Sequence, residues 1–161
     1  MSFHDLPQDW PTRSLADPDL AVDVLDLVVT DRDRMPGGLS FLLCRGDGRL
    51  SQPVFVGSIP HAAAMRETVS STVLTAVTLP GVGGLVVGIV KPWGGVDDSD
   101  RALHEHILQM CRQADLPLLG TCVVTGTGIY HLPVAVDLPA APGRGQDEGG
   151  RTGRDRAQGA A

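Results

Sequence analysis

The side chains best placed to do chemistry follow an apolar run, Gly84 to Val90, in the middle of the chain. Lys91 supplies a cation, Trp93 supplies a large apolar surface, and two glycines and a set of hydrogen-bonding side chains come next. A buried strand that ends in a glycine-rich loop and leads into a helix is a common place for binding sites in α/β proteins. We therefore define a candidate binding rim of eight residues: Lys91, Trp93, Gly94, Gly95, Asp97, Asp98, Ser99 and Asp100.

Two interpretations of this rim are open. In the first, Asp97 or Asp98 caps a helix and Trp93 covers the end of the sheet. In the second, Trp93 is a rigid apolar anchor and Lys91 a charge in a recognition surface, a pairing that interface hot spots use. The rim contains no histidine, cysteine or glutamate. The chemistry that it offers is therefore recognition, and no catalytic residue is assigned to it.

Other candidate groups are scattered along the chain. His104 and His106 are two residues apart, whereas two imidazoles on one helical face need a spacing of four, so we expect them to point in different directions. His61 and His131 are isolated in the sequence. The three cysteines lie in apolar runs without C-x-x-C spacing and are interpreted as small core residues: Cys44, Cys111 and Cys122. We assign no metal ligand and no cofactor.

Composition limits the class of protein. A chain of 161 residues, 42% of them apolar, can bury one core, so we expect a single domain. The formal net charge of -6 and the lack of a basic patch argue against nucleic acid as a partner. No apolar run reaches the roughly 18 residues of a membrane span, and the acidic start of the chain does not resemble a signal peptide. The odd cysteine count suits a reducing compartment, and we expect a cytoplasmic protein.

Local patterns predict a single, three-layer-like α/β domain with a mixed sheet. The predicted order of elements is α-β-β-α-β-α-β-β. Asp17-Pro18 starts the first helix, and Arg45 to Gly48 reads as a hairpin turn. Pro53 implies that the second strand lies at a sheet edge or bends there, and residues 84–90 form the central strand. The predicted helices are 17–29, 60–79 and a third that Asp97 or Asp98 caps; the predicted strands are 39–44, 50–56, 84–90, 117–125 and 129–134.

The remaining segments divide the chain. Residues 1–16 read as an irregular N-terminal arm and residues 31–38 as a charged loop. The α/β domain extends over 17–138. Residues 139–161 contain too few bulky apolar side chains to offset the entropy of ordering, and we expect a disordered tail.

The segment Ile89-Val90-Lys91-Pro92-Trp93-Gly94-Gly95, followed by Ser99 and a helix, resembles the RadC-like branch of the JAB/MPN (JAMM) domain family. Gly48-Arg49-Leu50, Gly57-Ser58, Leu116 to Leu119 and Val123 to Gly126 add to this resemblance, which covers about residues 37–134. In that family a strand ends in His-x-His and a Ser-x-x-Asp opens the next helix; these histidines and the aspartate bind zinc, and an upstream glutamate activates water. The resemblance implies a JAB-like core, an architecture shared with cytidine deaminases.

The residues at the matching positions differ from the zinc ligands and the glutamate of that family. Alignment on Ser99 places Ile89 and Lys91 at the two histidines, Ala102 at the aspartate and approximately Gly37 at the glutamate. Zinc requires lone-pair donors, which an alkyl chain, an ammonium and a methyl group lack. The resemblance therefore implies a degenerate metal site, in which an ion pair from Lys91 to Asp97 or Asp100 takes the place of the metal.

Two hypotheses follow. The first is a non-catalytic binding or scaffolding module of a bacterial cytoplasm that has a protein partner or forms a homodimer, without nucleic acid or membrane. The alternative is a metal-dependent hydrolase, isopeptidase- or deaminase-like, whose rearranged site draws ligands from His61, His104, His106 or aspartates. A third option, a role in DNA repair beside RadC, rests on the family name alone.

Overall fold

The first helix forms where the sequence places its cap. In the computed structural model, which describes residues 6–133, α1 covers Pro18–Val28. The Asp17 carboxylate accepts a hydrogen bond from the Asp19 N–H at 3.1 Å, and Pro18, which has no N–H to satisfy, occupies the first turn. This confirms the predicted helix. Residues 1–5 and the predicted tail, 139–161, lie outside the described residues.

The first two strands form the predicted hairpin. Strand β1, Gly38–Cys44, is buried along its whole length and pairs antiparallel with β2, Leu50–Gly57. Gly48 in the connecting turn has a φ of +83°, which glycine adopts without the steric cost of a Cβ. Strand β2 lies at one edge of the sheet, as Pro53 predicted.

The second half of the chain follows the predicted order with shorter elements. Helix α3 covers Ala62–Ala76, β3 covers Gly84–Val90, and α4 covers Asp98–Gln113. Strands β4, Leu118–Val124, and β5, Ile129–Leu132, form the closing hairpin. Helix α3 begins two residues after Pro60 because His61 is its cap, and it ends three residues before the predicted Leu79.

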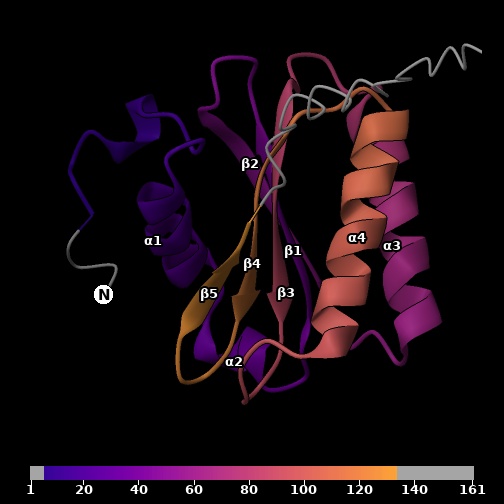
Figure 1. Ribbon diagram of the computed structural model, residues 1–161. Coiled ribbons are helices and arrows are strands. Elements are labelled where there is room, and N and C mark those ends of the chain that lie inside the picture. The colour runs from indigo at the N-terminus through magenta and orange to yellow at the C-terminus, as the bar shows by residue number, and fades with distance from the viewer. Residues whose placement is uncertain (1–5, 134–161) are drawn as a thin grey trace, which may run out of the picture.

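The five strands form a mixed sheet in the order β2-β1-β3-β4-β5. Strand β3 is central: it runs antiparallel to β1 and parallel to β4. Figure 1 shows α3 and α4 side by side on one face of the sheet and α1 on the other. The chain thus forms three layers, and the carboxyl end of β3 lies at the same edge of the sheet as the amino ends of α3 and α4.

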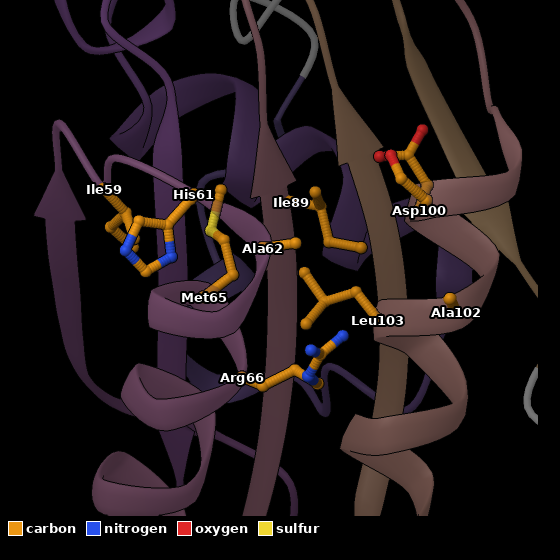
Figure 2. Close-up of a pocket in the computed structure, with 10 residues that line it drawn as sticks. Ile59, His61, Ala62, Met65, Arg66, Ile89, Asp100, Ala102 and Leu103 are labelled. Carbon is orange, nitrogen blue, oxygen red and sulfur yellow. The ribbon is translucent and has the colours of Figure 1, made fainter.

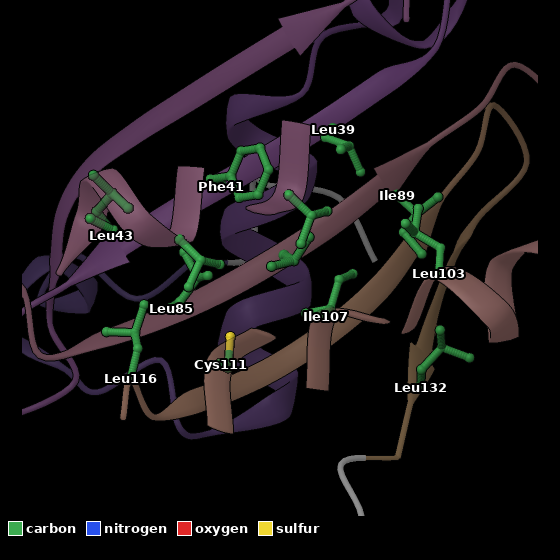
Figure 3. Close-up of a cluster of buried hydrophobic side chains, with 14 of the residues drawn as sticks. Leu39, Phe41, Leu43, Leu85, Ile89, Leu103, Ile107, Cys111, Leu116 and Leu132 are labelled. Atoms are coloured by element: carbon green, nitrogen blue, oxygen red, sulfur yellow. The ribbon is translucent and has the colours of Figure 1, made fainter. Parts of the chain in front are cut away.

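Each face of the sheet has its own apolar core. On the α3/α4 face, Phe41 and Leu85 from the sheet pack with Ile107 from α4, and all three side chains are fully buried (Figure 3). On the α1 face, Leu25 and Val24 pack against Val86 of the central strand. Because both faces of β3 are covered, its uniformly apolar sequence is explained.

The charged segment 31–38 contains a helix that the sequence did not predict. Helix α2, Asp31–Arg34, begins with a capping box in which Thr30 and Asp33 exchange side-chain and backbone hydrogen bonds. Arg34 is buried, and its guanidinium donates to the Thr125 carbonyl at 2.8 Å, to the Asp26 carboxylate at 2.7 Å and to the Val29 carbonyl at 3.3 Å. The prediction of a loop was wrong because these partners are supplied by the tertiary structure.

The described part of the N-terminal arm, residues 6–16, is irregular as expected, apart from one short helix. Residues Trp10–Thr12 form a 3-10 helix, and Leu15 is fully buried in the core on the α1 face. The indole of Trp10 packs against the same core. These contacts tie the part of the arm that is described to the domain.

The cysteines are core residues, as predicted. Cys44, Cys111 and Cys122 are all buried and form no disulfide. Burial raises the pKa of the Cys44 and Cys111 thiols to about 11 and that of Cys122 to about 12, so the thiols are protonated at neutral pH and weak nucleophiles. Among residues 6–133, no helix has the length and apolar character required to cross a bilayer.

Candidate functional site

The candidate rim begins where β3 leaves the sheet. The Lys91 N–H donates to the Val124 carbonyl at 2.9 Å, and the Pro92 carbonyl accepts the Gly126 N–H at 3.0 Å. A Cβ on Gly126 would lie 2.7 Å from the Pro92 oxygen, so this close approach requires glycine. The rim is therefore held against the turn between β4 and β5.

Lys91, Asp97 and Asp100 form a compact ionic cluster at the start of α4. The Lys91 ammonium lies 3.1 Å from Oδ2 of Asp97 and 2.5 Å from Oδ2 of Asp100. Asp100 is only 4% exposed, and it also accepts the Asp97 N–H at 2.9 Å while Asp97 accepts the Asp100 N–H at 3.0 Å. The expected ion pair is thus present, with both carboxylates, and the cluster doubles as the capping box of α4.

Lys91 and Asp97 keep their charges at neutral pH. Partial burial lowers the pKa of Lys91, but the hydrogen bonds and negative charges of Asp100 and Asp97 raise it more, and the pKa lies above its usual value. The Ser99 hydroxyl, the Asp100 N–H and the Lys91 ammonium donate to Asp97 and hold the pKa of its carboxyl well below the usual range. Lys91 therefore acts as a fixed cation and not as a general base.

The other half of the rim faces solvent. Trp93 is 71% exposed, Gly94 has a φ of +91°, and Gly95 has open space around its Cα. Asp98 is exposed and pairs with Arg101 in the first turn of α4. The interpretation in which an aspartate caps the helix is confirmed for Asp97, but Trp93 is too exposed to cover the end of the sheet.

Two of the three positions that the resemblance aligns with zinc ligands line one pocket. Ile89 and Ala102 line a cavity of about 320 Å³ between α3 and α4, together with Asp100, the partner of Lys91 (Figure 2). These side chains do not fit a zinc ion, because none of Ile89, Lys91 and Ala102 has a lone pair to donate. Gly37, near the position of the family's glutamate, has a φ of +70°, and a Cβ there would lie 2.9 Å from the Val90 oxygen.

The pocket itself was not predicted from the sequence. Its wall on the α3 side comes from Ile59, Met65 and Arg66, and Leu103 faces them from α4. Met65 belongs to the apolar stripe that predicted α3. The sequence around it does not indicate that a pocket separates this residue from α4. A small-molecule site of this kind is typically mostly apolar with a few polar groups.

The histidines lie in separate places. His61 caps α3 by accepting the Ala64 N–H at 3.1 Å, whereas His104 is buried and pairs with the Pro133 carbonyl at 3.0 Å. His106 is half-buried, and its Nε2 lies 3.0 Å from the Ser70 hydroxyl. The different directions of His104 and His106 are confirmed. Within residues 6–133, no group of three or more His, Cys, Asp or Glu side chains is arranged to hold a metal ion.

The Ser70–His106 contact is structural. The Ser70 hydroxyl donates to the Arg66 carbonyl at 3.0 Å, and His106 Nε2 lies 3.1 Å from the same carbonyl oxygen. Nε2 next to a carbonyl oxygen carries the proton, so it is a donor there and cannot take a proton from serine. The contact joins α3 to α4.

Comparison of the sequence with known protein families and with curated proteins finds no match.

Proposed function

We propose that this chain is a non-catalytic binding module on a RadC/JAB-like framework, with the end of β3 as its recognition surface. The observation that carries the proposal is the Lys91 ammonium, paired with Asp97 and Asp100 beside the pocket that Ile89 and Ala102 line. In the resembled family this end of the strand holds zinc. Here an ionic cluster with one buried carboxylate, that of Asp100, occupies the neighbouring position and keeps the start of α4 in place.

The exposed half of the rim supports a recognition role. Trp93 is the most exposed of the large apolar side chains in the described part of the chain, and it is held on a loop that is bonded to the β4–β5 turn. An exposed tryptophan on a fixed backbone presents apolar area with little entropy to lose on binding. We infer a protein surface as its partner, and a second copy of this chain is the simplest one.

Restoring the family's ligands tests the framework. The triple variant Ile89→His, Lys91→His, Ala102→Asp is expected to bind stoichiometric zinc, while the wild-type chain binds none, because Ile89 and Ala102 line one pocket and Lys91 pairs with Asp100, which also lines it. Elemental analysis of the purified proteins and the zinc dependence of the melting temperature measure this.

The matched control is the double variant Ile89→His, Lys91→His, which carries the same changes in β3 but lacks the carboxylate ligand. It should bind zinc more weakly than the triple variant. A folded triple variant that binds no zinc would contradict the RadC/JAB-like framework. Stoichiometric zinc in the wild-type chain would instead contradict the non-catalytic assignment.

Trp93→Ala tests the recognition surface. It is expected to weaken self-association about 30-fold, the effect of losing a hot-spot side chain, and to leave the melting temperature nearly unchanged because Trp93 is 71% exposed. Sedimentation equilibrium over a range of concentrations gives the association constant.

Leu74→Ala is the control for Trp93→Ala, since Leu74 is an exposed apolar residue on α3 and lies outside the rim. It should not change association. If the wild-type chain stays monomeric at high concentration, or if Leu74→Ala has the same effect as Trp93→Ala, the rim is not a dimer interface.

A further inference from the structure

The pocket between α3 and α4 has an apolar interior and an unpaired cation. Six of its lining residues are apolar, from α3, α4, β3 and the segment before α3: Ile59, Ala62, Met65, Ile89, Ala102 and Leu103. Figure 2 shows Met65, Ile89 and Leu103 in the middle of the pocket, with Arg66 and Asp100 at different ends. A cavity of about 320 Å³ with this lining suits a small apolar group.

Arg66 is the cation that lines this pocket, and its side chain is exposed. Its guanidinium forms no ion pair or hydrogen bond with any other residue in 6–133, whereas Asp100 at the other end is paired with Lys91. A guanidinium has five N–H donors in a planar fork that matches a carboxylate. The cation next to an apolar interior therefore favours a ligand with an anionic head and an apolar body.

Two further features at the α3 end favour an anion. His61 Nδ1 accepts the Ala64 N–H, so a neutral His61 carries its proton on Nε2 and is a donor there. The first turn of α3 contains no acidic residue, and the partial positive charge at the amino end of this 15-residue helix is left without a carboxylate of its own. At the start of α4, by contrast, Asp97 and Asp100 already fill that role.

The geometry points to a binding site for a small aliphatic monocarboxylate in this pocket. The carboxylate pairs with Arg66 on the α3 side of the pocket, and the hydrocarbon body packs on Met65, Ile89 and Leu103. This inference rests on the proposed function, because it assumes that the site at the end of β3 binds its ligand and does not cleave it. At the other end of the pocket, Asp100 is already paired with Lys91 and offers no second cation, which favours a single anionic group.

Octanoate is the probe, titrated into the full chain and followed by calorimetry. Wild-type protein is expected to show saturable binding at one site, and octylamine, which has the same chain and the opposite charge, is expected not to bind. Arg66→Gln should weaken octanoate binding about tenfold or more, the loss expected for a charge-assisted hydrogen bond. Arg112→Gln, at an exposed arginine near the other end of α4, is the matched control and should leave binding unchanged.

A second variant tests the cavity without touching the charge. Ala102 lines the pocket and is exposed, so Ala102→Phe places a ring in the cavity with the core intact, and it should abolish octanoate binding while the melting temperature is kept. Absence of saturable binding to the wild-type chain, equal binding of octylamine, or binding that survives either Arg66→Gln or Ala102→Phe unchanged would overturn the inference. If octanoate does not bind but the triple variant binds zinc, the inference about this pocket fails and the proposed function stands. If the wild-type chain binds stoichiometric zinc, the proposed function fails, whatever the octanoate result.

Discussion

Asp100→Ala is expected to lower the free energy of unfolding by about 3 kcal/mol, since it breaks a buried ion pair from one side. Asp100 is 4% exposed, and its carboxylate accepts hydrogen bonds from the Lys91 ammonium and from the Asp97 N–H. The variant leaves a partly buried ammonium with one exposed partner and removes half of the α4 capping box. Urea unfolding followed by circular dichroism measures the loss.

A matched control and a rescue separate the charge from the fold. Asp98→Ala removes a fully exposed carboxylate from the same helical turn and should cause no measurable change. Adding Lys91→Met to Asp100→Ala removes the partly buried cation that has lost its buried partner and should recover much of the stability. If Asp100→Ala costs no more than Asp98→Ala, or if Lys91→Met deepens the loss, the cluster does not stabilise the start of α4 in the way described.

Arg34→Met is expected to cost about 3 kcal/mol as well, for a different reason. The Arg34 guanidinium binds the Asp26 carboxylate and two backbone carbonyls, those of Val29 and Thr125. Methionine fills part of the volume but cannot donate, so these acceptors lose their partner in a buried place. The free energy of unfolding from urea denaturation gives the effect.

Arg32→Met is the control for Arg34→Met, because Arg32 lies on the same short helix and is exposed. It should leave the stability unchanged. Because Arg34 joins α2 to the turn after β4, amide exchange at Thr125 to Gly128 should speed up in Arg34→Met and not in Arg32→Met. Equal losses in the two variants would mean that helix content, and not the buried contact, is responsible.

Both residues hold the same edge of the sheet. Asp100 fixes Lys91 at the end of β3, and Arg34 fixes Thr125 at the end of β4, next to the Pro92–Gly126 hydrogen bond. Trp93 and the pocket lining are thereby presented on a backbone that is braced from both helical layers. A binding surface of this kind gains affinity because little of it has to be ordered when a partner arrives.

Much of the fold could be predicted because its signals are local. Asp17-Pro18 marks the start of α1, Gly48 permits the turn of the first hairpin, and the uniformly apolar Gly84–Val90 indicates a strand covered on both faces. Asp97 is followed three residues later by Asp100, a spacing that allows a capping box. Each of these patterns involves neighbours in the chain, so no knowledge of the tertiary structure is needed to interpret it.

The features that could not be predicted depend on partners far away in the sequence. Arg34 reads as a loop residue until Thr125 and Asp26 surround it, and His106 reads as a surface histidine until Ser70 of α3 meets it. The pocket arises because α3 and α4 lie side by side with their amino ends at one edge of the sheet. No pattern in the sequence around Arg66 predicts that its guanidinium lacks an ion pair among the described residues.

The predicted order of the main helices and strands follows from the sequence alone, because hydrophobic period, glycine turns and capping aspartates act over a few residues; the short helix α2 was missed. Three features of the site come from the packing of distant segments: Ile89 and Ala102 line one cavity, Arg66 lies beside it without a counter-ion among residues 6–133, and Trp93 is left in solvent. Burial and charge balance at a site are set by which helices pack together, and that packing joins residues separated by dozens of positions in the chain.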